Sequence, residues 1–523
     1  MPSFLSNSRS SGILAHITSL PGPYGIGDIG DSSFRFIDFL ERCGQRFWQI
    51  LPISPTDLHF DSSPYMSTSA FAGSPLLISP QGLVEEGWLD PGDLARPPAF
   101  SPYLTDYRQV SAYKNRLLTR SFQNFSTAYD RHYPEFIRRT PWLNDYALFM
   151  TLKEVYSGQP WYRWPPPLAH RQPEAMAEAE DRYSERTEYY LFEQYVFFRQ
   201  WAKMKQYAQL NHISLIGDLP IYVGLDSCDV WANQSIFELD TETLKPIRVA
   251  GVPPDYFSTT GQRWGNPLYL WNDHDPGVGA ALLKWWVDRF RAVFSMVEVT
   301  RVDHFRGFES YWAVPEIEET ALNGTWVEGP GESFFNDIYK ELGRLNIIAE
   351  DLGEITPEVH KLRDTLGFPG MKVLQFAFDG NPENPFLPYN FKTANCVVYT
   401  GTHDNDTSMG WFLSAVLSEQ QRNTVKRFAN RHMHDSSPIN EDLIYLALSS
   451  TAALAIIPLQ DLLGFGSDCR MNTPGVPAGN WRWRCDQNYL TDALADGFRE
   501  LTSRFNRMGP PRSDGKGSLR KDS

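Results

Sequence analysis

The chain has 523 residues, a formal net charge of −15 and 42% hydrophobic residues, which suits one large domain with insertions or a few smaller domains. The acidic balance argues against nucleic acid as a partner, because phosphate binding requires a basic surface. The sequence contains no apolar run of about 18 residues, so it predicts no membrane span. Its first residues lack the apolar stretch of a signal peptide, and we therefore expect a cytoplasmic protein.

Eight short apolar runs recur along the chain, and nearly all of them end in polar residues. They cover residues 12–17, 46–53, 213–223, 297–305, 346–353, 373–378, 395–404 and 453–461. Helical patterns lie between several of them, as over 32–44 and 279–294, and this alternation predicts parallel strands buried on both faces. Eight such strands predict an α/β fold, the (β/α)8 TIM barrel, whose chemistry lies at the C-terminal strand ends. An open doubly wound sheet is the alternative, but no glycine-rich phosphate-binding motif follows an early strand.

The uneven spacing of the runs predicts insertions into the barrel. Roughly 160 residues separate the second run from the third, more than one crossover needs. They include the proline-rich segment 164–167 and a charged helical pattern over 173–207, so we expect a largely helical subdomain at about 54–210, over the C-terminal face. A second insertion is expected at 224–275, an active-site region in which 251–267 forms a long ordered loop.

The remaining composition predicts one catalytic domain over residues 1–506 and a disordered tail over 507–523, which is polar and contains glycine and proline. The five cysteines are scattered and form no CxxC pair, so we expect reduced thiols rather than disulfides or a zinc site. Aromatic residues make up 14% of the chain, and many lie beside polar segments. Most would serve a large core, but such rings also suit the apolar faces of sugars.

Carboxylates end three of the apolar runs: Asp303, the pair Glu350 and Asp351, and Asp404. In a barrel these three ends converge on one mouth. One such acid alone is more often structural than catalytic, but three converging acids repel one another and cost stability, so a functional reason is favoured. Paired carboxylates are used in glycoside chemistry, where one protonates the leaving oxygen and the other meets the anomeric carbon.

Strand alternation adds a detail to the fourth run. Arg301 and Asp303 are two residues apart, so their side chains share a face, and we expect the guanidinium to keep Asp303 ionised. A general acid needs the opposite, a raised pKa that lets it hold a proton near neutrality. Alternation alone does not decide whether Glu350 or Asp351 faces inward.

Two other chemistries fit the residues less well. His16, His304 and His403 also lie near strand ends, which raises the alternative of a metal site. However, no HExxH motif and no spaced histidine pair on a helix occurs. A serine nucleophile is not supported either, because the chain has no GxSxG motif. We therefore expect no metal and no organic cofactor.

Long motifs follow one another nearly from end to end. They are HITSLPGPYGIGDIG (16–30), WQILP (48–52), SPYMSTSAFAGSP (63–75), GDLPIYV (217–223), DVWAN (229–233), GVPPDYFSTTGQRWGNPLYLW (251–271), RVDHFRGF (301–308), AEDLGEITPEV (349–359), GFPGMKVLQFAF (367–378), GTHDNDT (401–407), DLLGFG (461–466) and RMNTPGVPAGNWRWR (470–484). In these motifs and their order the chain resembles the 4-α-glucanotransferases of the amylomaltase, or disproportionating-enzyme, family, relatives of the α-amylase superfamily. The resemblance implies a (β/α)8 barrel with inserted subdomains and no separate C-terminal β-domain.

The resemblance also implies roles for single positions. Asp303 matches the nucleophile, Glu350 rather than Asp351 matches the general acid/base, and Asp404 matches a third acid that binds sugar hydroxyls and stabilises the transition state. Tyr65 resembles the aromatic platform under the sugar ring, and Trp264 resembles a residue on the acceptor side. The full set that resembles substrate-binding positions is Tyr65, Asp218, Trp264, Arg301, His403 and Asn472.

The implied reaction is the retaining transfer of an α-1,4-glucan segment to the 4-hydroxyl of an acceptor glucan or glucose, through a covalent glucosyl-enzyme. Such chemistry predicts a nucleophile-to-acid/base separation of about 5–5.5 Å. The expected partners are maltooligosaccharides and amylose, with no nucleic acid and no membrane, and the chain is expected to act as a monomer or homodimer. The alternatives are an α-1,4-glucan hydrolase of the same superfamily and a non-catalytic glucan-binding protein.

Overall fold

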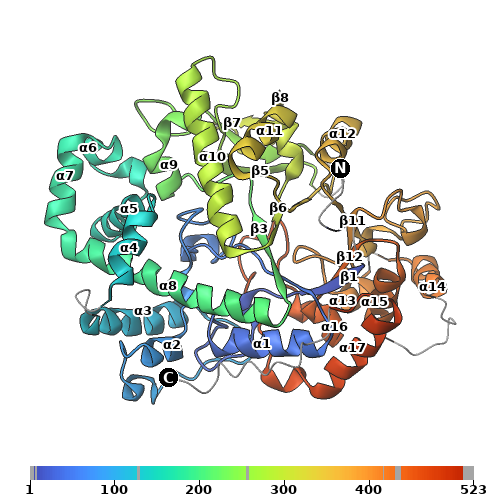
Figure 1. Cartoon of the computed structure of the whole chain (residues 1–523). Helices are drawn as coiled ribbons and strands as arrows, with labels where there is room; N and C mark the ends of the chain where they lie inside the picture. The colour runs from blue at the N-terminus through green and yellow to red at the C-terminus, as the bar shows by residue number, and fades with distance from the viewer. Residues whose placement is uncertain are drawn as a thin grey trace.

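A closed barrel of eight parallel strands forms the centre of the computed structural model, which describes residues 5, 9–125, 130–254, 258–415, 417–429 and 438–509. The barrel strands follow one another in the order β1-β12-β11-β10-β9-β6-β3-β2. Their bounds are β1 Ser10–Leu14, β2 Phe47–Gln49, β3 Ser214–Leu219, β6 Val299–Val302, β9 Ile347–Ala349, β10 Gly370–Val373, β11 Cys396–Tyr399 and β12 Leu454–Pro458. The predicted TIM barrel is therefore confirmed (Figure 1).

The sixth strand lies upstream of its predicted position. The apolar run 373–378 predicts a strand there, but β10 ends at Val373 and the chain continues as a 3-10 turn over Leu374–Phe376. Leu374 is fully buried, so this run reflects core packing after the strand. The first residue of β10, Gly370, has no room for a side chain, because a Cβ atom there would lie 2.4 Å from Asp351 Oδ2.

The long segment between β2 and β3 is mostly helical. Its helices are α2 Pro80–Glu85, α3 Tyr107–Asn124, α4 His132–Arg139, α5 Leu143–Val155, α6 Pro166–Ala169, α7 Pro173–Arg182 and α8 Ser184–Leu210, and they gather on one side of the barrel (Figure 1). The charged pattern over 173–207 is two helices that meet at Tyr183. The last turns of α8 lead into β3, and Tyr207 packs edge-on against Phe34 with ring centroids 5.0 Å apart. Phe34 belongs to α1 (Asp31–Arg42), the helix that connects β1 to β2. Since α8 packs beside α1 and leads into β3, it also serves as the helix that connects β2 to β3.

A second, antiparallel sheet stands beside the barrel, in the order β5-β4-β7-β8. Its strands are β4 Arg248–Val252, β5 Gln262–Pro267, β7 Ser310–Pro315 and β8 Thr325–Glu328. The prediction of a long loop over 251–267 was wrong at both ends, where β4 and β5 lie, and residues 255–257 lie outside the described residues. The pattern gave no strand signal because Gly251, Gly265 and Asn266 interrupt it.

Helices follow the later barrel strands. They are α9 Cys228–Ala232, α10 Pro276–Met296, α11 Gly331–Leu342, α12 Pro357–Leu366, α13 Ser408–Leu413, α14 Glu419–Phe428, α15 Ile439–Ser449, α16 Leu459–Leu463 and α17 Asp492–Arg504. The predicted helices over 32–44 and 279–294 agree with α1 and α10. Within the described part of the chain, no strand follows β12 and no helix is both long and apolar enough to cross a membrane.

The ordered chain extends past the predicted start of the tail at residue 507. Arg507 is fully buried, and its guanidinium donates hydrogen bonds to four backbone carbonyls. The acceptors are the carbonyl oxygens of Leu448, Ser10, Ser450 and Ala452, at 2.7 to 3.0 Å. A charged residue in a segment that contains proline and glycine thus ties the start of β1 to the end of α15 and the residues that lead into β12. Residues 510–523 lie outside the described residues.

Candidate active site

Four barrel strands, the adjacent β3, β6 and β9 and, beyond β10, β11, carry polar side chains at or just after their C-terminal ends. Asp218 is the second-last residue of β3, and Asp303 directly follows β6. Glu350 directly follows β9, and Asp404 lies a few residues beyond β11. The carboxyl ends of parallel barrel strands open onto one face, so the three predicted acids share the mouth of the barrel.

Arg301 joins the ends of β3 and β6. Its Nη2 donates to Asp303 Oδ1 at 2.8 Å, and its Nη1 contacts both carboxyl oxygens of Asp218, at 2.9 and 2.7 Å. The expected pairing of Arg301 with Asp303 on one strand face is confirmed. Arg301 and Asp218 are buried, whereas the Asp303 side chain remains 30% exposed, so its carboxylate is open to the mouth. Burial raises the pKa of Asp218 to about 6, although Arg301 opposes the shift.

Tyr65 links Asp218 to the end of β11. Its hydroxyl donates to Asp218 Oδ2 at 2.8 Å and lies 2.8 Å from His403 Nε2. Because the Tyr65 hydroxyl donates its one proton to Asp218, His403 Nε2 is the donor in the second contact, and this same N–H also lies within reach of Asp404. The rings of Tyr65 and His403 stack with centroids 5.2 Å apart. Trp481, a residue without a predicted role, lies 5.8 Å from the Tyr65 ring and extends this aromatic wall.

Asp404 is held by residues from two segments. Asn472 Nδ2 donates to its Oδ1 at 2.6 Å, and His403 Nε2 lies 3.2 Å from its Oδ2. Burial by itself would raise the pKa of Asp404, but the charge of His403 and hydrogen bonds from His403 and Asn472 outweigh burial and lower it. Burial likewise opposes the charged form of His403, and Asp404 reverses this effect and raises the pKa of His403.

Arg470 is a residue that the sequence reasoning missed. Its Nη2 donates to the Asp404 carbonyl oxygen and its Nε to the Asn472 carbonyl oxygen, both at 2.6 Å. It therefore ties the loop after β11 to the segment that carries Asn472. Arg470 is the first residue of the motif at 470–484, but only the folded chain brings residues 404 and 470 together.

Glu350 has a different environment from Asp303. Its Oε2 accepts the backbone N–H of His304 at 2.7 Å, and its Oε1 accepts that of Leu352 at 2.9 Å. Burial is the largest influence and raises the pKa of Glu350 to about 7, and the negative charge of Asp303 adds to the effect. Arg301 and the two backbone hydrogen bonds oppose it. Glu350 can thus hold a proton near neutrality, as a general acid requires.

Asp351 points away from the mouth, which resolves the choice that alternation left open. Its Oδ1 accepts the backbone N–H of Met371 at 2.7 Å, and its Oδ2 pairs with Arg363. Met371 lies in β10 and Arg363 in α12, so Asp351 fastens β9 to both elements. Of the two adjacent acids, one is structural and the other faces the site.

Trp264 reaches the site from β5 of the second sheet. Its indole lies edge-to-face with the His304 ring, at 4.8 Å between centroids, and tilts toward Tyr222 at 6.3 Å. The nine predicted site residues therefore form one connected group. The contacts run through Asn472, Asp404, His403, Tyr65, Asp218, Arg301 and Asp303, and His304 joins Glu350 and Trp264 to them.

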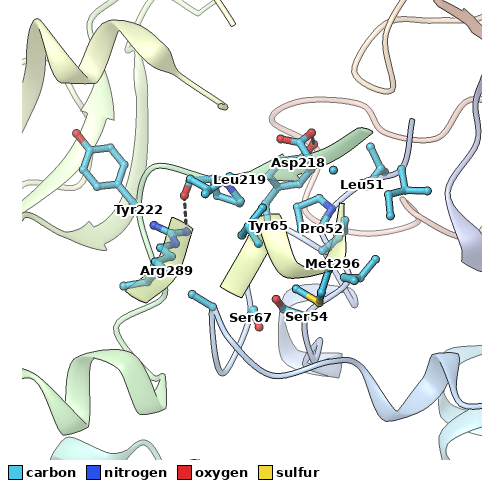
Figure 2. Close-up of a pocket in the computed structure, with 18 of the residues that line it drawn as sticks. Leu51, Pro52, Ser54, Tyr65, Ser67, Asp218, Leu219, Tyr222, Arg289 and Met296 are labelled. Carbon is cyan, nitrogen blue, oxygen red and sulfur yellow. Dashed lines mark hydrogen bonds between the residues drawn. The ribbon is translucent and has the colours of Figure 1, made fainter. Parts of the chain in front are cut away.

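The described residues contain no group of three or more histidines, cysteines or acids arranged to hold a metal ion. Burial lowers the pKa values of His16 and His304 to about 3, so both imidazoles are neutral at physiological pH. Tyr65 and Asp218 also line a pocket, together with Arg289 and Met296 of α10 (Figure 2). Arg289 donates to the Pro220 carbonyl and so supports the chain just beyond Asp218.

Comparison with known proteins points to one family. A profile of the 4-alpha-glucanotransferase family matches residues 15–490. The 4-alpha-glucanotransferase of Synechocystis sp. is 50% identical over 509 residues, which cover 96% of this chain and 98% of the relative. That of Thermus thermophilus is 45% identical over 489 residues, 91% of this chain and 94% of the relative.

Structural comparison agrees with the sequence comparison. An amylomaltase from Streptococcus agalactiae, solved in complex with acarbose, matches with a TM-score of 0.91 and 36% identity. The match covers 96% of this chain and 100% of that chain. The profile thus covers the second sheet, the helices between β2 and β3, and every barrel strand except β1. The chain belongs to the 4-alpha-glucanotransferase family.

Proposed function

We propose that this chain transfers α-1,4-glucan segments by a retaining double displacement, with Asp303 as the nucleophile and Glu350 as the general acid/base. One observation carries the assignment of roles: the two carboxyl groups have opposite environments at one barrel mouth. Asp303 is 30% exposed and lies 2.8 Å from a guanidinium nitrogen of Arg301, whereas Glu350 has no such partner among the described residues and burial raises its pKa to about 7. Family membership supports transfer on α-1,4-glucans as the reaction.

In the first step, an Asp303 carboxylate oxygen attacks the anomeric carbon of the donor glucan. The bond from that carbon to the glycosidic oxygen breaks, and Glu350 gives its proton to the departing oxygen. In the second step, the 4-hydroxyl of an acceptor glucan attacks the glucosyl ester, and Glu350 takes the hydroxyl proton. Each step inverts the anomeric carbon, so the α configuration is retained.

Asp404 and the residues around it would hold the sugar in the ring-distorted state that precedes attack. Asp404 is ionised and its Oδ1 and Oδ2 are fixed by Asn472 and His403, which suits a carboxylate that accepts hydrogen bonds from sugar hydroxyls. Tyr65 offers an aromatic face beside these groups. Such hydrogen bonds contribute to catalysis when they strengthen in the transition state.

Transfer rather than hydrolysis requires that an acceptor sugar compete with water for the glucosyl ester. Trp264 packs against the ring of His304, whose backbone N–H contacts Glu350, and would supply an apolar surface for the acceptor ring. A bound acceptor excludes water from the anomeric carbon and places its hydroxyl beside Glu350.

The test is incubation with maltotriose followed by separation of the products. Transfer produces a ladder of maltooligosaccharides both shorter and longer than the substrate, whereas a hydrolase produces only shorter sugars. Asp303→Asn should abolish the ladder, and Asp337→Asn, which makes the same chemical change on the exposed face of α11, should leave it unchanged. A ladder that persists in Asp303→Asn would refute the assigned nucleophile.

The proposal places the enzyme in the cytoplasm, as a monomer or homodimer. The five cysteines are free thiols, and four of them, Cys43, Cys228, Cys396 and Cys485, are buried, which suits a reducing compartment. Maltooligosaccharides and amylose are the proposed substrates. Light scattering of the purified chain would determine the assembly.

A further inference from the structure

The turn after β6 holds Glu350 by three hydrogen bonds. The Glu350 N–H donates to the Val302 carbonyl at 3.1 Å, and the Phe305 N–H donates to the Glu350 carbonyl at 3.1 Å. The third bond runs from the His304 N–H to the side-chain Oε2 of Glu350, at 2.7 Å. Asp303 lies in the same turn, so one short segment contains the proposed nucleophile and also forms hydrogen bonds with the proposed acid/base.

The third bond depends on an unusual backbone conformation. His304 has φ 49° and ψ 50°, the left-handed region that side chains other than glycine, asparagine, aspartate and histidine rarely adopt. This conformation reverses the chain directly after Asp303 and allows the N–H groups of His304 and Phe305 both to face Glu350. Backbone strain of this kind is retained where the surroundings impose it, commonly in active sites.

We propose that His304 is a positioning residue whose left-handed backbone conformation fixes the carboxyl group of Glu350 relative to Asp303. The proposal rests on the roles assigned above to these two acids. It concerns the backbone of His304, and it therefore predicts that the identity of the side chain matters mainly through its tolerance of the left-handed region.

The ring of His304 makes a separate contact. It lies edge-to-face with Trp264, at 4.8 Å between centroids and 84° between planes. Burial keeps the imidazole neutral, with its pKa lowered to about 3. The ring therefore supports the acceptor side, and the backbone supports Glu350. Substitutions that all remove the ring but differ in backbone tolerance can separate the two contributions.

The hydrogen bond from His304 also affects the protonation of Glu350. A backbone N–H that donates to a carboxylate stabilises the ionised form, so its loss raises the pKa of the acid. The charged groups that face Glu350 are Arg301 of β6 and Asp303, which directly follows β6. Substitutions at position 304 leave both of them in place, so a shifted pH profile would report the lost backbone bond.

The experiment compares four variants that all lack the ring. His304→Gly and His304→Asn tolerate the left-handed conformation, whereas His304→Ala and His304→Val do not. We expect the first pair to keep the alkaline limb of the kcat/KM profile for maltotriose transfer at the wild-type pH. We expect the second pair to shift it upward by about 0.5 to 1 pH unit and to lower kcat by about tenfold relative to His304→Gly. Near-UV circular dichroism establishes that each variant is folded, and His304→Ala serves if His304→Val does not fold.

α-Maltosyl fluoride provides a second readout. Fluoride leaves from the anomeric carbon with the bonding electron pair and needs no proton, so the first step no longer depends on a positioned acid. The burst of fluoride release from His304→Ala should recover to within about threefold of the His304→Gly rate. Equal losses in all four variants would overturn the proposal, because the ring would then carry the effect. Wild-type activity in folded His304→Ala would overturn it as well.

The same assays distinguish this proposal from the proposed function. Glu350→Gln should lose maltotriose transfer but keep the fluoride burst. If Glu350→Gln retains full transfer, the assigned acid/base is wrong whatever the variants at position 304 do. If Glu350→Gln behaves as expected and the four variants at position 304 do not differ, only the positioning role fails.

Discussion

Replacement of Glu350 by glutamine tests the protonation state of this carboxyl through folding stability. Burial raises the pKa of Glu350 in the folded chain from 4.5 to about 7. Below pH 4.5 both the folded and the unfolded chain bind this proton. As the pH rises from 4.5 to about 7, the unfolded chain releases the proton and the folded chain keeps it, so the free energy of unfolding of the wild type falls. The Glu350→Gln variant has no proton to release and escapes this loss.

The size of the effect follows from the pKa. A rise from 4.5 to about 7 corresponds to about 3 kcal/mol, at 1.36 kcal/mol per pH unit. Glu350 is only partly buried, so solvent screens part of this energy, and we expect about 2 kcal/mol. The amide of glutamine also directs its NH2 group at the N–H of either His304 or Leu352. That cost does not change with pH and cancels when two pH values are compared.

The assay is urea unfolding of wild type and Glu350→Gln at pH 5 and at pH 8. The stability of the variant relative to the wild type should increase by about 2 kcal/mol between the two. Glu354→Gln is the matched control, because Glu354 is an exposed carboxyl in the same segment, and its relative stability should not change. A relative stability of Glu350→Gln that is constant or falls with pH would refute the reasoning that burial keeps Glu350 protonated.

Three further substitutions follow from the contacts. Tyr65→Phe keeps the ring but removes the hydrogen bond to the buried Asp218, and kcat/KM for maltotriose should fall about tenfold or more. Arg470→Met frees the loop that carries Asp404, and kcat should fall at least about tenfold while the thermal midpoint changes little. Arg507→Met removes the guanidinium bonds to four carbonyls, of which those of Leu448 and Ser450 keep Arg9 as a donor, so it should cost about 2–4 kcal/mol in urea unfolding, with unchanged kcat at 25 °C. A wild-type kcat/KM in Tyr65→Phe, a wild-type kcat in Arg470→Met or a wild-type free energy of unfolding in Arg507→Met would contradict the corresponding contact.

The barrel could be predicted because buried parallel strands are short apolar runs, and the acids could be predicted because they follow those runs directly. The exception is β10, where Leu374 and the apolar residues after it pack into the core as a turn, and apolar composition does not separate a strand from a buried turn. The folded structure was also needed to decide which of Glu350 and Asp351 faces the barrel mouth. Arg363 and Met371 both contact Asp351, and these contacts turn its side chain away from the mouth.

The second sheet and the supports of the site could not be predicted from local pattern. β4 pairs with β7, although the barrel strand β6 lies between them in the sequence. The glycines in β4 and β5 also weaken the strand pattern of these segments. Arg470 touches the carbonyl of Asp404, and His304 adopts the left-handed region, only when the chain is folded. These contacts join distant segments, and periodicity within a segment carries no information about them.

The most direct test of the account is to trap the covalent intermediate. Glu350→Gln is mixed with α-maltosyl fluoride, and the products are analysed by intact mass and by peptide mapping. The fluoride leaves without acid assistance, and the second step lacks its base, so the ester should accumulate. We expect one maltosyl adduct per chain, on the peptide that contains Asp303, and no adduct in the double variant Asp303→Asn/Glu350→Gln. An adduct on another residue would contradict the central claim, as would full transfer activity in Asp303→Asn.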